Sequence, residues 1–488
     1  MGMASTFHGL ELGKRGLYAQ QSALNTTSHN ITNVNTIGYS RQRAEMQATN
    51  AIPYPGMHGD KSPAQLGTGV EVNKLIRLRE EFLDVQFRNE YKNLGYHEAK
   101  SGTFTRIEEL LNEPSEDGLA HTMDEFWKGW QELVKNPDSA AVRSVVRQKG
   151  VAVAQTFNQI MDSLDQMQND LQNIIKTKTE EVNSLASQIS ILNEQISRRI
   201  VNDYQPNDLL DQRDVLIDQL SKIVDIDVKN SSNGMVDISV GNGALVTGKT
   251  SNKLTIGFDQ NSGLVDPAEI KIGGQTVDLG SGELLGNIES YGIMGGNRNS
   301  TIPYYKDKIN ELAMTFANAV NEVHLSGLNL DNISGVSNTK VEFFTGSSAK
   351  DLKVNPEIMK SLNLIAAAKD EGGGQSSKGN GELAQEIANI KFKDLNFTGT
   401  TSTADDFYRN IIGQLGIDSQ ESQRMQNNYE GIIKQVENRR QSVSGVSLDE
   451  EVANMIKFQQ AYNAAARIVT SVDQCLDKVI NGMGRVGL

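Results

Sequence analysis

The octapeptide GALVTGKT at residues 243–250 is the part of this sequence that most resembles a catalytic motif. Its Gly243, Gly248, Lys249 and Thr250 match the phosphate-binding P-loop letter for letter. That motif binds phosphate only between a strand and a helix, because backbone N–H groups and the helix N-terminus must converge on the phosphate. Here the spacer ALVT has a strand pattern, and KTSNKLTIGF continues as a turn and another strand. We therefore predict a hairpin in a β domain, with a nucleotide-binding enzyme as the remote alternative.

A second group with chemical potential is Asp211, Arg213 and Asp214 in the segment DLLDQRD. These side chains could transfer protons, but such mixed charges on a helix more often form a salt-bridged face, which we predict here. The histidines are dispersed and show no HExxH or other ligand spacing, so no metal site is predicted. They are His8, His29, His58, His97, His121 and His324. The sequence thus predicts no catalytic residues, no metal and no cofactor, and hence a protein that is not an enzyme.

The tryptophans and the cysteine are predicted to have structural roles. Trp127 and Trp130 in EFWKGW are predicted to be packing anchors of a helical bundle. Cys475 is the only cysteine, which excludes an intrachain disulfide and a multi-cysteine metal site. We predict that it is a small apolar filler on a helix, with a reactive thiol as the alternative.

Length and composition limit what the chain can be. At 488 residues it exceeds the size of a single core, so two to four domains are expected. The hydrophobic fraction of 38% and the aromatic fraction of 6% indicate an elongated molecule with much polar surface. The net charge of -14 disfavours nucleic acid and anionic membranes as partners. No apolar run approaches the roughly 18 residues of a membrane span, and the N-terminus does not read as a cleaved signal peptide. We expect a protein that stays inside the cell or leaves it by another route.

The first half of the chain is mainly helical in pattern. Residues 1–36 read as a helix that ends in an Asn-rich turn before Gly38, and a Gly- and Pro-rich arm with short strands follows. From Glu80 to Val201 the pattern is helical, with turns at NEPSEDG and KNPDS. The longest helix is predicted from Ser139 to Arg199, on the order of 90 Å at 1.5 Å per residue.

The second half mixes strands and helices. After the short helix LLDQRDVLIDQLSKIV the apolar period changes to two, which predicts a small antiparallel β domain over residues 225–290. A helix is expected over 304–324, and the Gly- and Ser-rich section 326–380 contains a short strand at VEFF. Helices return from residue 383 to the end, with breaks at LGIDSQ and QSVSGVS.

Both ends of the chain carry an apolar stripe with a seven-residue repeat. In the first helix the repeat is Leu10, Leu17, Leu24 and Ile31. In the last it is Met455, Tyr462, Val469 and Leu476, with a second position at Val452, Gln459, Ala466, Asp473 and Ile480. Two such stripes can bury each other as a coiled coil, although neither supports a helix alone.

The start of the last helix carries a capping-box spacing, Ser447 followed by Glu450. The polar residues Lys14, Gln21, Gln459 and Asp473 lie inside the stripes and would weaken an isolated pair. Two interpretations stay open. Either the stripes assemble with neighbouring chains, or both ends are weakly packed edge helices. For assembly, the predicted interface residues are Leu10, Leu17, Leu24, Ile31, Val452, Met455, Tyr462, Val469, Leu476 and Ile480.

The two ends also resemble a known family. The segment GLELGKRGLYAQQSALNTTSHNITNVNTIGYSRQR is similar to the N-terminal signature of flagellar rod, hook and hook-associated axial proteins. The segment GVSLDEEVANMIKFQQAYNAAARIVTSVDQCLDKVIN resembles their C-terminal signature. The form GYSRQR, SVSGVSLDEE and the internal LLDQRD are most similar to the hook-associated proteins at the junction of hook and filament. A hook, rod or other hook-associated axial protein is the alternative.

The resemblance implies a structural part of the bacterial flagellum that joins hook to filament through paired terminal helices. It implies export of the unfolded chain by a type III apparatus, a secreted extracellular location, and terminal segments that become ordered on assembly. The implied partners are the flagellar hook protein, the next hook-associated protein, an export chaperone at the C-terminal helix, and further copies of this chain in a ring or helical assembly. No nucleic acid, membrane or cofactor is implied.

The predicted fold class is multidomain and mainly α, an elongated helical bundle with terminal coiled-coil helices and an inserted small antiparallel β domain. Residues 1–45 and 445–488 are assigned to terminal assembly helices. The helical bundle with its extended arm takes 46–224, 300–325 and 380–444. The β domain takes 225–299, and a small irregular insertion takes 326–379.

Overall fold

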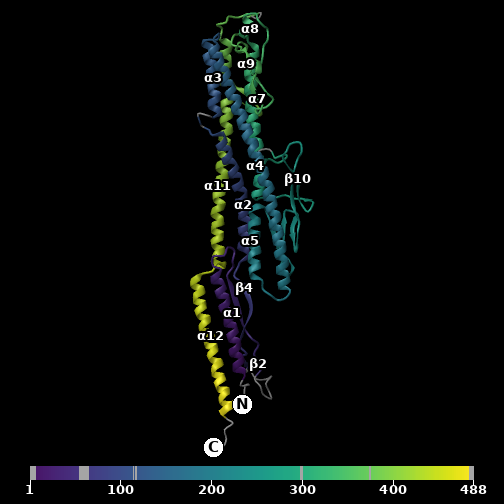
Figure 1. The fold of residues 1–488 in the computed structure, drawn as a ribbon, viewed down its shortest axis with the longest axis vertical. Helices are drawn as coiled ribbons and strands as arrows, with labels where there is room; N and C mark the ends of the chain where they lie inside the picture. Colours follow the sequence, from purple (N-terminus) through teal and green to yellow (C-terminus); the bar gives the residue numbers. More distant parts are fainter. Residues whose placement is uncertain are drawn as a thin grey trace.

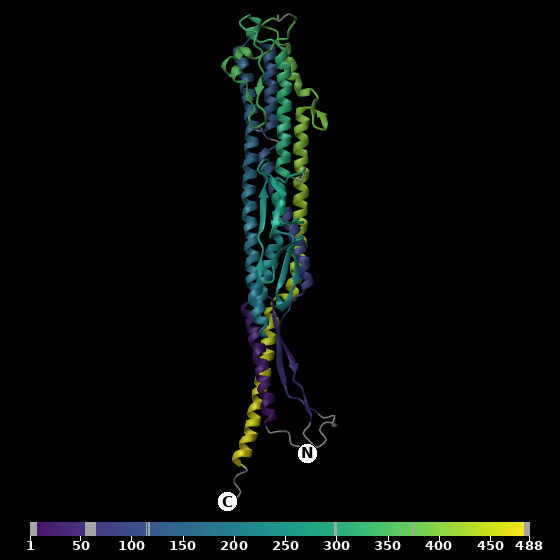
Figure 2. The same cartoon turned by 90° about the vertical axis from the view of Figure 1, so that its right-hand side faces the viewer.

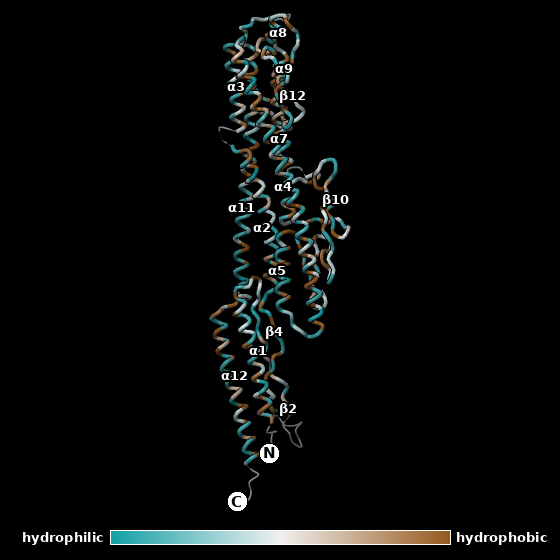
Figure 3. Tube along the Cα trace, viewed as in Figure 1, coloured by the Kyte–Doolittle hydropathy of each residue, from teal (hydrophilic) through white to brown (hydrophobic). Residues whose placement is uncertain are grey.

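The computed structural model describes residues 7–53, 65–113, 115, 118–296, 300–372 and 375–482. Most of its helices lie along one axis, so the molecule is long and narrow (Figures 1 and 2). The apolar positions recur along the whole length of the tube in Figure 3 instead of gathering at one centre. The predicted fold class, mainly α and elongated, is confirmed. None of the described helices combines the length and the apolar composition of a membrane-spanning segment.

The bundle consists of long helices packed side by side. Its helices are α2 (Glu81–Leu111), α3 (Leu119–Lys135), α4 (Ala140–Ile200), α5 (Asn207–Ile223), α6 (Glu283–Tyr291), α7 (Thr301–Ser326), α10 (Glu382–Asn389) and α11 (Ala404–Ser444). The 61-residue α4 begins after Ser139, whose hydroxyl accepts a hydrogen bond from the amide of Val142. The predicted start and length of this helix are therefore confirmed. α2 packs against α11, α5 and α6, and α4 packs against α3 and α5.

The predicted break at LGIDSQ is wrong. α11 runs through this segment without interruption, although it contains Gly413 and Gly416. A glycine inside a helix costs about 1 kcal/mol relative to alanine, and burial of Ile411 and Leu415 outweighs that cost. The region 395–402, which was predicted to be helical, instead forms a hairpin of β14 (Leu395–Phe397) and β15 (Thr400–Ser402).

Two small sheets lie beside α4 (Figure 1). One has the order β5 (Asp227–Asn230), β6 (Val236–Val240), β7 (Gly243–Thr247) and β8 (Thr250–Ser251), and the other β11 (Gln275–Thr276), β10 (Val265–Ile272) and β9 (Leu254–Phe258). All their pairings are antiparallel. The range assigned to this β domain, 225–299, is not all strand. Its last part contains the helix α6. The apolar residues of α6 follow a helical period and pack against α2 and α4.

The end of the bundle far from the chain termini is a tip of short elements (Figure 1). They are α8 (Leu330–Ile333), β12 (Phe344–Thr345), β13 (Lys353–Val354) and α9 (Pro356–Lys360). The predicted packing role of Trp127 and Trp130 is confirmed, because both indole rings are buried here. They contact the rings of Phe126, Phe316 and Phe343.

At the opposite end, α1 (His8–Thr32) and α12 (Leu448–Asp477) lie side by side and antiparallel (Figures 1 and 2). We call them the terminal pair. The predicted arm forms a ribbon beside α1, in which β1 (Gln42–Ala48) pairs with β4 (Val70–Arg77) and β2 (Ile52–Pro53) with β3 (Gln65–Leu66). The predicted terminal helices and arm are thus confirmed as elements, and the helices are already paired within one chain.

Candidate functional site: the terminal pair and its attachment to the bundle

The residues that resembled a P-loop form a β hairpin. Strand β7 ends at Thr247, Gly248 has a positive φ of 53°, and β8 begins at Thr250. The amide of Gly248 donates to Oδ1 of Asp237 over 2.7 Å, so this N–H group already has an anionic partner. The element after β8 is strand β9. The predicted hairpin is confirmed.

The Asp211 segment is a salt-bridged helix face, as predicted, but it is buried. Oδ1 of Asp211 accepts from Nη1 of Arg77 at 2.8 Å, and Oδ2 accepts from the amide of Ser40 at 3.0 Å. Burial raises the pKa of Asp211 above its ordinary value despite these contacts. Arg213 differs from the two aspartates, because its guanidinium donates to Oδ1 of Asn193 and to the carbonyl of Gly234.

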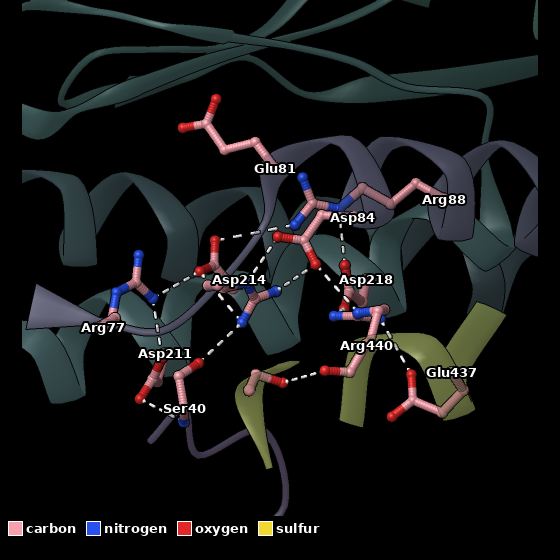
Figure 4. A network of polar contacts seen from close by, with 12 residues as sticks. Ser40, Arg77, Glu81, Asp84, Arg88, Asp211, Asp214, Asp218, Glu437 and Arg440 are labelled. Atoms are coloured by element: carbon pink, nitrogen blue, oxygen red, sulfur yellow. Dashed lines mark hydrogen bonds and ion pairs between the residues drawn. The ribbon is translucent and has the colours of Figure 1, made fainter. Parts of the chain in front are cut away.

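Around Asp214 lies a row of alternating carboxylates and guanidinium groups, which we call the ion-pair network (Figure 4). Asp214 lies 2.8 Å from Arg77, 3.5 Å from Arg79 and 3.8 Å from Arg88. Burial raises the pKa of Asp214, but these arginine charges together outweigh it, so the pKa lies below its ordinary value. Loss of one partner from a buried pair costs about 3 to 5 kcal/mol, because the other charge stays buried.

The same network continues to the other helices of the bundle. Arg79 binds Asp84 with two hydrogen bonds of 2.6 and 3.0 Å. Arg440 of α11 reaches Asp84 at 3.0 Å and Asp218 at 2.7 Å, and its guanidinium lies over the ring of Phe87. The network therefore joins β4, α2, α5 and α11 at the level where the terminal pair begins.

A second buried polar group joins the two ends of the chain directly. We call Asn30, Arg41 and Glu451 the clasp. Nε of Arg41 donates to Oε1 of Glu451 at 2.8 Å, and Nδ2 of Asn30 donates to Oε2 at 2.9 Å. The amide nitrogen of Asn30 also donates to the carbonyl of Gln42, and its Oδ1 accepts from the hydroxyl of Tyr39. Asn30 and Glu451 are 1% and 2% exposed.

The clasp was not predicted, although its members lie in the two end segments that carried the family resemblance. Neither Asn30 nor Glu451 was assigned from the sequence to a contact between the two ends of the chain. Both residues lie one position before the predicted stripes, so the seven-residue repeat gave no signal for them. The predicted capping box is wrong, because the hydroxyl of Ser447 accepts no capping hydrogen bond from a described residue. Glu450 instead pairs with Nη1 of Arg41 at 2.6 Å.

The structure places the predicted interface residues in two groups. Those that are partly buried within the terminal pair are Leu10, Leu17, Leu24, Ile31, Met455, Tyr462, Val469 and Leu476. Val452 and Ile480 point away from it and are 48% and 69% exposed. The more buried second stripe of α12 is shifted by one residue from the predicted one and contains Glu451, Phe458, Ala465 and Val472.

This shift also changes the interpretation of the polar residues. Lys14, Gln21, Gln459 and Asp473 are exposed, so they do not weaken the pair by being buried in it. Cys475 is exposed on α12, and the prediction of an apolar filler is wrong for the single chain. Among the described residues, no group of three or more His, Cys, Asp or Glu is arranged to hold a metal ion, and His58 lies outside them.

Comparison with protein-family models gives three matches along the chain. Residues 104–344 match the flagellar hook-associated protein FlgK helical domain. Residues 438–482 match the flagellar basal body rod FlgEFG protein C-terminal model, and residues 10–39 match the flagella basal body rod protein model. The two terminal matches contain α12 and most of α1.

Comparison with whole proteins gives full-length relatives. Flagellar hook-associated protein 1 of Bacillus subtilis (strain 168) is 39% identical over 99% of both chains. The protein of the same name from Escherichia coli (strain K12) is 26% identical over 96% of this chain and 98% of its own. The flagellar hook junction protein FlgK from Burkholderia pseudomallei has a similar fold, with a TM-score of 0.59 and 14% identity, over 75% of this chain and 100% of that one.

Proposed function

This chain belongs to the flagellar hook-associated protein 1 family, and on that premise we propose how its structure joins the hook to the filament. The protein is a structural component of the bacterial flagellum at the junction of hook and filament. In our proposal the terminal pair inserts into the tubular axial assembly, the bundle carries load, and the two sheets beside α4 face outward. The ends at 1–45 and 445–488 are then the assembly domain, and residues 46–224, 300–325 and 380–444 are the load-bearing domain.

The observation that carries this proposal is the incomplete burial of α12. Of its 30 residues, all within the described part of the chain, only Glu451 and Ala465 are buried. Leu448, Val452 and Ile456 follow one another at intervals of four residues and are 48%, 48% and 55% exposed. Apolar side chains in such a row gain about 25 cal/mol for each Å² that a neighbour covers. The row therefore favours association with further chains.

The proposed partners follow from the family. They are the hook protein on one side, the next hook-associated protein on the other, further copies of this chain, and an export chaperone that covers the C-terminal helix before secretion. A chain with one cysteine forms no intrachain disulfide that would oppose unfolded passage through a type III channel. We further propose that the protein acts outside the cell and has no catalytic activity.

The test is incorporation of variants into flagella of cells that lack their own copy of the protein. We expect Val452→Asp and Ile456→Asp to abolish incorporation, because each puts a charge into the contact, while the bundle stays folded by circular dichroism. Ile417→Asp is the matched control, since Ile417 is 58% exposed on α11 of the bundle. Normal incorporation of both α12 variants would show that this row is not the assembly surface.

A further inference from the structure

The terminal pair has one definite antiparallel register. Three close contacts and one polar contact define it. As the residue numbers rise along α1, those of the contacted residues fall along α12. They are Gly9 with Val472, Gly13 with Val469, Gly16 with Ala465, and Asn30 with Glu451. The two stripes that face each other repeat every seven residues, so apolar packing alone also permits a register displaced by one heptad.

The residues in contact resist such a slip only in part. Val469 packs where a Cβ at Gly13 would lie only 2.7 Å away, and after a slip of one heptad it would face Gln20 instead. Val472 would again face a glycine, Gly16. The chain between α1 and β1, residues 33–41, has nine residues and can span roughly 30 Å. A heptad of helix is only about 10 Å long. The loop can therefore extend far enough for α1 to move one heptad away from the bundle.

The clasp is different, because it has one satisfactory arrangement. In the observed register both oxygens of Glu451 accept hydrogen bonds, from Arg41 and from Asn30. After a slip of one heptad away from the bundle, Phe458 would face Asn30, and the buried carboxylate would lose the amide. A buried charge without its partners is costly, whereas loss of an apolar contact that recurs one heptad later costs little.

We propose that the clasp is the register lock of the terminal pair. It determines which residue of α1 faces which residue of α12, and thereby which apolar side chains of α12 face away from α1. Glu451 is in this sense a specificity-determining residue whose main effect is on register and not on helix stability. The inference concerns a single chain and holds whether or not the exposed row on α12 is the assembly surface.

Disulfide formation between paired cysteines tests the register in the purified full-length chain, with Cys475→Ser in every variant to remove the native thiol. A Cβ at Gly16 would lie 3.4 Å from Cβ of Ala465, which is close to the separation of roughly 3.5 to 4.5 Å in disulfides. Gly16→Cys with Ala465→Cys therefore reports the observed register. Gly16→Cys with Val472→Cys reports the register displaced by one heptad.

With Glu451 present we expect the first pair to oxidise and the second to stay reduced. Glu451→Leu should raise the yield of the displaced disulfide about tenfold, the change that corresponds to one lost charge-assisted hydrogen bond. Circular dichroism should show the helix content unchanged, because Arg41 keeps Glu450 and Asn30 keeps Gln42 as partners. Glu451→Gln is the matched control. Its one amide oxygen can still accept from Arg41, but its NH2 group would face the donor of Asn30, so its yield of the displaced disulfide should lie between those of Glu451 and Glu451→Leu.

Three results would overturn the inference. The first is an unchanged disulfide pattern in Glu451→Leu. The second is a yield of the displaced disulfide in Glu451→Gln as high as in Glu451→Leu. The third is loss of helix content and of both disulfides in Glu451→Leu, which would make Glu451 a stability residue. Incorporation into flagella is not part of this readout, so failure of the proposed assembly surface would be seen separately.

Discussion

His324 shows how one buried side chain can secure the tip of the bundle. Nδ1 of the ring donates to the carbonyl of Val341 at 2.8 Å, and Nε2 accepts from the amide of Ala366 at 2.9 Å. The bond from Ala366 requires the neutral ring, because a protonated Nε2 cannot accept. The pKa of His324 is lowered to about 4, mainly by burial and also by the nearby charge of Arg143, while the bond to Val341 acts in the opposite direction.

The sign of the pH dependence follows from this lowered pKa. As the pH falls, His324 of the unfolded chain binds a proton near the ordinary pKa of about 6.5, which is at a higher pH than in the folded chain. The contribution of His324 to stability is therefore complete above pH 6.5 and is lost as the pH falls toward 4. The total is on the order of 3 kcal/mol. We expect the denaturation midpoint of the tip, followed by tryptophan fluorescence, to fall over this range.

The control for this prediction is His324→Gln, whose amide can donate and accept hydrogen bonds but does not titrate. Trp130 is a local probe, since its ring lies 6.3 Å from that of His324. Carboxylates titrate at low pH in both proteins, so the difference between their two curves of denaturation midpoint against pH isolates His324. A difference that stays constant between pH 6.5 and 4 would refute the assignment.

At the scale of elements, substitution by alanine should have opposite effects on stability at two glycines in long helices. A methyl group at Gly416 of α11 would have no heavy atom within 4 Å among the described residues, so Gly416→Ala should stabilise the chain by about 1 kcal/mol. A methyl group at Gly150 of α4 would lie 2.7 Å from Cε1 of the buried Phe343. Gly150→Ala should therefore destabilise it by about 1 to 3 kcal/mol through overpacking. Denaturant midpoints measure both, and equal shifts of one sign would contradict this interpretation.

These elements also show what the sequence could and could not predict. The limits of α4, the GALVTGKT hairpin and the tryptophan cluster were predictable, because helix caps, two-residue alternation and aromatic spacing are local signals. The continuity of α11 was not, because contacts with α2 from a distant part of the sequence decide whether Gly413 and Gly416 break the helix. The clasp was not predictable either, since a period of seven does not say which polar side chain is buried. The one-residue shift of the second stripe in α12 has the same origin.

At the scale of the whole molecule, the bundle and the terminal pair are held together by different forces. The bundle buries apolar side chains along its length, and one continuous cluster runs from Phe104 on α2 to Leu415 on α11. The terminal pair is joined to it by polar contacts of the segment after α1. The amide of Ser40 donates to Asp211, that of Arg41 to the carbonyl of Ser444, and the side chain of Gln42 to Asp208. A helix that buries few apolar residues draws little stability from tertiary contacts. The terminal pair should therefore open far more often than the bundle in a single chain.

Hydrogen exchange measures this difference and connects it to assembly. In the purified chain we expect amides of α12 beyond Phe458 to exchange about 100-fold faster than those in the middle of α4, because local opening there exposes little apolar surface. In isolated flagella the same amides should become protected, since neighbouring chains would cover Val452, Ile456 and the residues that follow. Amides of α4 serve as the internal control and should change little. Equal protection of α12 and α4 in the purified chain would show that the terminal pair is stable without partners. Unchanged exchange in flagella would show that assembly does not cover it.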